Sequence, residues 1–279
     1  RSRRILDELL TRFMVLNMSA EYVTHDSTAI VTGGGRGIGQ AICVELAARG
    51  FDVVIADIDD EAMDETAAQI EAEGQTGFPM YTDLGDEDSV ESTVAAIERF
   101  DTIEVLVNNA GIAGPTSPCE EVATDEWEQT VAVNLTGPFA TCRAVLPHMK
   151  DAGYGRIVNI ASVTGKRPLV NRTPYATTKM GLVGFTRTLA AEVGEHDINV
   201  NAVCPGSVDG PRIRRVFEKQ AEANGETYEA VRADVEAESA RGELVQREDV
   251  ADLVAFLCSD QATRITGQDI NVSAGKVMY

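Results

Sequence analysis

The fold is decided by the stretch Ala29-Ile30-Val31-Thr32-Gly33-Gly34-Gly35-Arg36-Gly37-Ile38-Gly39-Gln40-Ala41-Ile42. Its β-branched start predicts a strand, its glycines predict a tight turn, and the segment from Ile38 onward has a helical pattern. Glycine in such a turn allows positive φ and lets the backbone approach a pyrophosphate, which the N–H groups and dipole of the following helix attract. We therefore expect a phosphate-binding turn that includes Gly33, Arg36, Gly37, Ile38 and Gly39.

Strand-like and helix-like segments alternate along the rest of the chain. Short runs, all but one of them with β-branched residues, predict strands at 29–32, 52–56, 77–81, 105–108, 156–160, 199–203 and 269–272. Longer helical patterns predict helices at 38–49, 60–73, 86–100, 124–151, 174–194 and 247–259. Because this order builds βαβ units, the expected fold class is α/β, with seven parallel strands covered by helices on both faces.

Length and local composition suggest how the domain is organised. The 279 residues are enough for one large α/β domain, which we place at 27–279. We expect residues 1–26 to be an extension outside this domain and the native start to be Met14 or Met18, because residues 1–17 hold four arginines whereas the rest is rich in acid. Residues 207–244 depart from the alternation and predict two short helices.

The chain is strongly acidic, with 45 acidic against 24 basic residues and a formal net charge of −21. Such a surface repels nucleic acid, so we expect no nucleic-acid partner. Only five of the basic residues are lysines, and this acid-rich, lysine-poor composition leads to the hypothesis of a halophilic origin. Since no run of about 18 apolar residues occurs, we expect no membrane-spanning helix.

Cysteine usage gives no sign of a metal site or of a disulfide framework. The five cysteines are widely scattered, with no C-x-x-C spacing and no neighbouring histidine cluster. They are Cys43, Cys119, Cys142, Cys204 and Cys258. We expect buried, reduced thiols in a cytoplasmic protein.

A second motif has the spacing Ser-x12-Tyr-x3-Lys and consists of Ser162, Tyr175 and Lys179. Positions i and i+4 share a helix face, so Tyr175 and Lys179 would point the same way. An adjacent ammonium lowers the pKa of a phenol, which is about 10 when the phenol is isolated. Taken alone, the Tyr-Lys pair is also compatible with an ordinary solvated helix face.

The glycine turn, with its T-G-x-x-x-G-x-G spacing, and the Ser-Tyr-Lys motif together resemble the short-chain dehydrogenase/reductase family, over residues 28–275. This resemblance implies a single Rossmann-type doubly wound domain with 207–244 as a helical substrate lid. It also implies hydride transfer between a nicotinamide dinucleotide and a secondary alcohol or ketone. Oxidation needs a base for the hydroxyl proton, a role that suits Tyr175.

The resemblance implies roles for the other residues of the site. Lys179 would also hold the nicotinamide ribose, and Ser162 would donate a hydrogen bond to the substrate oxygen. Asn134 matches the asparagine of distorted helical backbone that holds a water between the lysine and solvent. An ordinary polar helix position is the alternative for Asn134.

Cofactor preference depends on Asp57, which ends the second predicted strand 18 residues after Gly39. A carboxylate there would accept hydrogen bonds from the adenosine ribose hydroxyls and would repel a 2′-phosphate. Ile58 follows where NADP-preferring members often have a basic residue, although Arg36 could still reach a phosphate. We therefore expect NAD rather than NADP; the alternative is that Asp57 is only a helix N-cap.

Three further segments resemble cofactor contacts of the family. Their residues are Asp83 and Leu84 beside the adenine, Asn109, Ala110 and Gly111 after the fourth strand, and Pro205, Gly206 and Val208 along the nicotinamide. The chain departs from the family pattern at Gly210, where many members have threonine. Whether Ser207 replaces that threonine is open.

The motifs described above leave several substrate classes open. We expect a sugar, polyol or other small hydroxylated molecule, with a 3-oxoacyl thioester reductase as the alternative, and a non-catalytic dinucleotide-binding sensor or scaffold as an alternative from another class. Residues 162–215 contain eight basic and four acidic residues, which indicates either an anionic substrate or ion pairing at subunit contacts. The resemblance also implies a homotetramer with the 124–151 and 174–194 helices at one interface.

Overall fold

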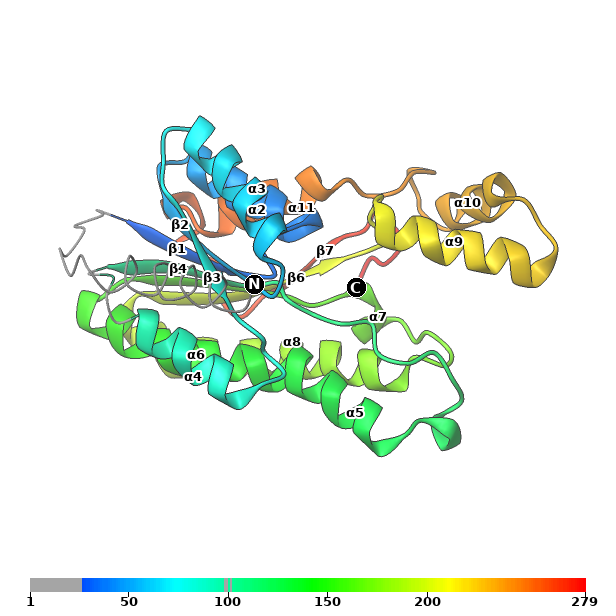
Figure 1. Ribbon diagram of the computed structural model, residues 1–279, viewed down its shortest axis with the longest axis horizontal. Helices are drawn as coiled ribbons and strands as arrows, with labels where there is room; N and C mark the ends of the chain where they lie inside the picture. Colours follow the sequence, from blue (N-terminus) through cyan, green and yellow to red (C-terminus); the bar gives the residue numbers. More distant parts are fainter. Residues whose placement is uncertain (1–26, 98–99, 101) are drawn as a thin grey trace, which may run out of the picture.

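The computed structural model describes residues 27–97, 100 and 102–279, and it contains one seven-stranded parallel sheet in the order β3-β2-β1-β4-β5-β6-β7 (Figure 1). The strands are β1 Thr28–Thr32, β2 Asp52–Asp57, β3 Gly77–Tyr81, β4 Ile103–Asn108, β5 Gly155–Ile160, β6 Ile198–Pro205 and β7 Asp269–Val272. The predicted α/β class and all seven strands are therefore confirmed. The extension expected at residues 1–26 and the native start expected at Met14 or Met18 both lie outside the described residues.

Helices cover both faces of the sheet. They are α2 Gly37–Ala48, α3 Asp60–Ala72, α4 Glu87–Ile97, α5 Thr124–Val131, α6 Gly137–Ala152, α7 Val163–Lys166, α8 Thr173–Val193, α9 Pro211–Asn224, α10 Tyr228–Ala237 and α11 Arg247–Leu257. Helices α2, α3 and α11 lie on one face, and α4, α5, α6 and α8 lie on the other (Figure 1). None of the described helices combines the length and the apolar character that a membrane span requires.

The core is formed where these helices meet the sheet. Successive strand residues alternate between the faces, so Val53 and Ile55 pack toward α2 and α3 whereas Val54 packs toward α6 and α8. Every residue of β1, β2, β5 and β6 is buried, as parallel strands covered on both sides require.

The strand order reverses between β1 and β4, the position at which doubly wound sheets have their ligand-binding crevice. After β1 the chain moves outward to β2 and β3, then returns to the other side of β1 and continues through β4 to β7. Loops leaving β1 and β4 therefore diverge at the carboxyl ends of the strands, which is where doubly wound sheets bind their ligands.

The helix expected at 124–151 is divided. A π-helical turn, Ala132–Thr136, separates α5 from α6. Pro138 has no N–H to donate to the carbonyl of Asn134 four residues earlier, so the α-helical ladder is interrupted at this point. The division matters for function because it displaces the backbone around Asn134.

The segment 207–244 forms the two predicted helices, α9 and α10, which project beyond the carboxyl edge of the sheet (Figure 1). They enclose a small core of their own, made of Phe217, Ala221, Val231 and Leu244. The phenyl ring of Phe217 lies 6.0 Å from the ring of Tyr228.

Candidate active site

The glycine turn after β1 is shaped to receive a ligand at the start of α2. A Cβ on Gly39 would overlap the carbonyl oxygen of Gly33, so only glycine lets the helix begin this close to the turn. Gly37 has φ +59°, and a Cβ there would meet nothing within 4 Å. The turn is thus packed tightly on its inner side and open on its outer side, which fits a pyrophosphate.

The turn is tied to the end of β4 by a residue that sequence reasoning missed. The Thr32 hydroxyl accepts hydrogen bonds from the backbone N–H groups of Asn109 and Ala110, each over 3.1 Å. The Asn109 amide in turn donates to the carbonyls of Thr32 and Gly33 over 3.0 and 2.9 Å. The two loops that border the crevice are therefore held in a fixed relation before any ligand binds.

Asn108 serves the sheet rather than the crevice. It is buried, donates to Asn159 on β5 over 2.9 Å, and accepts from the hydroxyl of Thr141 on α6 over 2.7 Å. The two consecutive asparagines therefore have different contacts: Asn108 joins β4 to β5, and Asn109 joins β4 to the glycine turn.

Asp57 lies at the carboxyl end of β2, and its carboxylate is buried against the glycine turn. One oxygen accepts from the N–H of Gly35 over 3.0 Å, and the other accepts from the N–H of Ile58 over 2.7 Å. The N-cap of α3 is Asp59, whose side chain accepts from Ala62, so the alternative that Asp57 caps this helix is wrong.

Arg36 projects from the turn and is largely exposed. Its guanidinium pairs with Asp59 at 2.8 Å. A pair this exposed contributes little to stability, but it draws the arginine toward the start of α3.

Tyr175 and Lys179 lie in the first two turns of α8. The Lys179 ammonium is 5.7 Å from the centroid of the Tyr175 ring and is buried, and it donates to the carbonyl of Ile160 over 2.8 Å. Ile160 ends β5, two residues before Ser162. Ser162 is itself buried, and its hydroxyl oxygen accepts from the N–H of Thr164 over 3.1 Å. The structure therefore groups the three residues of the Ser-Tyr-Lys motif where β5 meets α8.

Asn134 extends this group from the π-helical turn. Its amide forms two hydrogen bonds with the backbone of Ile112, of 2.8 and 3.0 Å, and donates to the Thr178 hydroxyl over 3.2 Å. That hydroxyl donates to the carbonyl of Tyr175 over 2.9 Å. A Cβ on Gly111 would lie 3.2 Å from the Asn134 oxygen and 3.4 Å from the Lys179 ammonium. Asn134 is thus no ordinary helix position, because it joins the loop after β4 to α8.

The remaining predicted cofactor residues border the same edge of the sheet. Asp83 accepts from the N–H of Gly85 over 2.8 Å, and Leu84 is buried against α6. Gly206 follows Pro205 at the end of β6 and packs on Ser273.

Val208 forms a bridge with Val245. In this bridge Val245 uses its own N–H and C=O toward Ser207 and Asp209, so the polar backbone groups of Val208 point to the opposite side. The hydroxyl of Ser207 lies 3.4 Å from the ammonium of Lys276.

Four of the eight basic residues at 162–215 form ion pairs within the chain. Lys166 and Arg187 both pair with Asp269, Arg167 pairs with Glu238, and Arg214 pairs with Asp209. Burial raises the pKa of Asp269, but the hydrogen bonds and charges of Lys166 and Arg187 outweigh that effect and leave the pKa below its usual range. Three cations of this span, Lys166, Arg167 and Arg187, are therefore compensated by two carboxylates outside it, those of Glu238 and Asp269.

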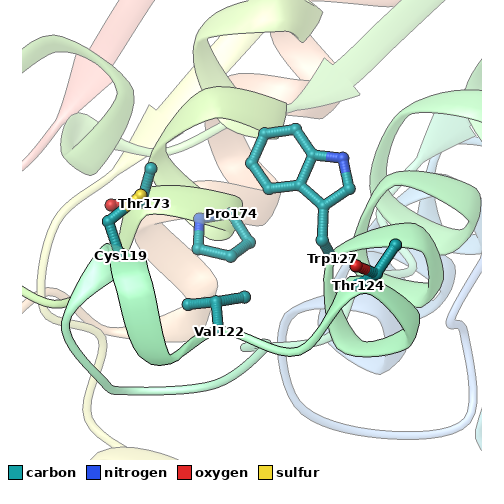
Figure 2. Close-up of a pocket in the computed structure, with 6 residues that line it drawn as sticks. All are labelled: Cys119, Val122, Thr124, Trp127, Thr173 and Pro174. Atoms are coloured by element: carbon teal, nitrogen blue, oxygen red, sulfur yellow. The ribbon is translucent and has the colours of Figure 1, made fainter.

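A shallow pocket of about 190 Å³ lies beside the N-terminal end of α8 (Figure 2). Its lining residues are Cys119, Val122, Thr124, Trp127, Thr173 and Pro174. None of the predicted site residues lines it. Cys119 is exposed there, so the expectation that all five cysteines are buried is wrong for this one. No group of potential metal ligands occurs in the part of the chain that the structure describes.

Comparison with known proteins identifies the same architecture elsewhere. A family model described as short chain dehydrogenase matches residues 27–222. The 3-oxoacyl-[acyl-carrier-protein] reductase of Pseudomonas aeruginosa is 37% identical over 251 residues, which cover 90% of this chain and 97% of that protein.

Two solved structures have a similar fold. A variant of actinorhodin polyketide ketoreductase with NADPH superposes with a TM-score of 0.86 and 36% identity, covering 92% of this chain and 99% of that one. An NAD⁺-bound xylitol dehydrogenase superposes with a TM-score of 0.84 and 28% identity, covering 91% and 100%. Similar proteins therefore bind either dinucleotide.

Proposed function

This chain belongs to the short-chain dehydrogenase family, and from that membership we propose an NAD-dependent oxidoreductase that interconverts a secondary alcohol and a ketone, or a lactol and a lactone, on a sugar, polyol or other small hydroxylated molecule. Membership itself establishes an oxidoreductase that acts on CH–OH or keto groups with a nicotinamide dinucleotide. The choice of NAD and the substrate class are the proposal.

The residues of the site fit the proposed chemistry. A bound dinucleotide supplies the hydride acceptor or donor. Tyr175 takes the proton of the substrate hydroxyl in oxidation and returns it in reduction, and the charge of Lys179 favours the ionised phenol. The Ser162 oxygen already accepts from Thr164, so its proton is the part left to donate to the substrate oxygen.

Asn134 supports this chemistry by holding the elements of the site together. By binding Ile112 and Thr178 it fixes the loop after β4 relative to the helix that carries Tyr175 and Lys179. The π-helical turn interrupts the regular α-helical hydrogen bonds at Asn134, which fits the water that the family resemblance implies between Lys179 and solvent.

Asp57 is the single observation that carries the NAD preference. Its buried carboxylate is held by Gly35 and Ile58 at the end of β2, where it is ready to accept from ribose hydroxyls and would repel a 2′-phosphate. Arg36, which could have balanced a phosphate, pairs with Asp59. The test is the ratio of kcat/KM for NAD and NADP with one substrate: we expect at least a tenfold preference for NAD, and a tenfold preference for NADP would refute the proposal.

A 3-oxoacyl thioester reductase is the second candidate, and the similarity to a 3-oxoacyl-[acyl-carrier-protein] reductase and to a polyketide ketoreductase supports it. Against it stands the surface charge. A reductase that receives an acidic carrier protein needs exposed positive charge, whereas Arg167 and Arg214 of this chain are neutralised by Glu238 and Asp209.

A substrate panel separates the candidates. NADH formation would be followed spectrophotometrically across secondary alcohols, sugars, polyols and hydroxy acids, and NADH oxidation would be followed with a 3-oxoacyl thioester, all at low and high salt. Turnover of the small alcohols supports the first proposal, and turnover of the thioester alone supports the second. Dinucleotide binding without any turnover would indicate the sensor or scaffold.

A further inference from the structure

Arg172, the residue before α8, lies against the ring of Tyr175. Its guanidinium carbon is 5.1 Å from the ring centroid, and the ammonium of Lys179 is 5.7 Å from the same centroid. Arg172 precedes the tyrosine by three residues and Lys179 follows it by four. The phenol is therefore flanked by a cation on each side along the helix.

The guanidinium also joins α8 to the loop after β4. One of its terminal nitrogens donates to the carbonyl of Ala113 over 2.8 Å, and the other donates to the hydroxyl of Thr116 over 3.3 Å. The N–H of Ser117 donates to the carbonyl of Asn171, the neighbour of Arg172, over 3.1 Å. Since Asn134 holds the same loop at Ile112, both ends of the 112–117 loop are attached to the helix that carries Tyr175.

We propose that Arg172 is a positioning residue for Tyr175, a role that rests on the proposed function. Its guanidinium binds the 112–117 loop through two nitrogens, and these hydrogen bonds keep a permanent cation against the phenol ring. A cation within about 6 Å of a ring centroid is attracted to its face, so the ring and the guanidinium hold each other in place. A nearby positive charge favours the ionised phenol, and arginine keeps that charge at every pH used in an assay.

Among the described residues, the other elements packed against α8 supply no equivalent cation. Residues 110–118 contain no ionisable side chain, and neither does the π-helical turn. On α5, the acidic residues Asp125, Glu126 and Glu128 are exposed. At the end of α7, Lys166 pairs with Asp269 and Arg167 pairs with Glu238. On β6, the thiol of Cys204 is buried, and this burial raises its pKa to about 11.

Titration of the phenol tests the proposal without requiring turnover. Tyrosinate absorption would be followed against pH in otherwise identical proteins with and without Tyr175, and the difference gives the ionisation of that residue alone. We expect Arg172→Gln to raise the midpoint by about 1 pH unit, as loss of a cation at this distance implies. Arg172→Lys keeps the charge and should leave the midpoint near the wild-type value.

Two further variants separate the cation from the loop contact and from general effects. Thr116→Val removes one acceptor on the loop while keeping the guanidinium. The midpoint of Tyr175 ionisation should therefore shift by less than about half as much as in Arg172→Gln. Arg143→Gln is the matched control, because Arg143 also lies over a ring, that of Phe139 at 5.5 Å, but on α6. It should not move the midpoint.

Kinetics supply the second readout once a substrate is known. The oxidation rate of Arg172→Gln should be about tenfold lower at neutral pH and should recover at high pH, because the missing cation acts through phenol ionisation. An equal loss at every pH, or an unchanged midpoint in Arg172→Gln, would overturn the proposal. If no substrate is turned over, the proposed function fails, whereas the titration still decides the role of Arg172.

Discussion

The ammonium of Lys179 donates to the carbonyl of Ile160 over 2.8 Å, which fastens the start of α8 to the carboxyl end of β5. Ser162 follows Ile160 by two residues, so this hydrogen bond sets the serine relative to the helix that carries Tyr175. The ammonium thus has a structural task as well as an electrostatic one. It cannot be removed without affecting both.

Tyr175→Phe should therefore be the cleaner probe of the chemistry. It removes the proton-accepting oxygen and keeps the ring against Arg172 and Lys179. We expect turnover to fall by about two orders of magnitude or more, the usual size of a general acid–base contribution, with dinucleotide affinity largely retained. Steady-state rates and a binding titration check this. Tyr154→Phe, at the amino end of β5, serves as the control, and near-normal turnover of the Tyr175 variant would remove this residue from the mechanism.

Asp57→Asn should relax the discrimination between dinucleotides. The variant keeps an oxygen to accept from the backbone but loses the charge that repels a 2′-phosphate. Since that repulsion is worth roughly 1 to 4 kcal/mol, the ratio of kcat/KM for NADP to that for NAD should rise by at least about fivefold. Asp64→Asn makes the same charge change on the exposed face of α3 and should leave the ratio unaltered. Equal ratios in the two variants would contradict the role given to Asp57.

One thiol should react in the native protein. Cys119 is exposed, whereas burial raises the pKa of Cys142 and Cys258 to about 12, of Cys204 to about 11, and that of Cys43 far above its usual range. Because the thiolate is the nucleophile, these four should react only after unfolding. Titration with an aromatic disulfide should give one equivalent natively and five in denaturant. Cys119→Ser should abolish the native equivalent, and reaction of a second thiol would show that the core opens.

Asp269→Asn should weaken the fold at neutral pH and much less in acid. Burial opposes ionisation of Asp269, but Lys166 and Arg187 outweigh it, so the folded pKa lies below the unfolded one. Stability from this group is therefore present above the unfolded pKa and is lost as the pH falls through the folded pKa. Urea unfolding at several pH values should show the difference between variant and wild type shrinking toward acid. Asp260→Asn, whose side chain is 90% exposed, should show little difference at any pH.

Salt should stabilise this protein. With a net charge of −21, the folded chain repels itself, and salt screens that repulsion. The thermal midpoint and the activity should both rise between dilute buffer and molar KCl. Indifference to KCl would contradict the halophilic hypothesis.

The sequence predicts the features that depend on local order. Six of the seven strands contain β-branched runs, whereas β3 has no β-branched residue, and Asp57 follows from its distance to the glycine turn. The helical pattern of 124–151 did not show that this helix is divided at Ala132–Thr136, although the family resemblance implied distorted helical backbone at Asn134. No periodicity reveals where a ladder hydrogen bond is lost.

The features that depend on distant partners could not be found in this way. The charges at 162–215 looked uncompensated because their acidic partners include Glu238 and Asp269, which lie beyond that span. The sequence likewise did not predict that Thr32 and Arg172 connect the loops of the site. The partners of Thr32 lie 77 and 78 residues away, and those of Arg172 lie 56 and 59 residues away. Contacts of this kind are created by the topology of the sheet.

The separate core between α9 and α10 bears on how such a protein changes during evolution. Phe217, Ala221, Val231 and Leu244 pack on one another rather than on the sheet. Substitutions in this pair of helices can therefore accumulate while the glycine turn and α8 keep their geometry. In the lid role that the family resemblance implies, this helical pair would be an exchangeable module, in which substrate preference could change while the glycine turn and α8 are conserved.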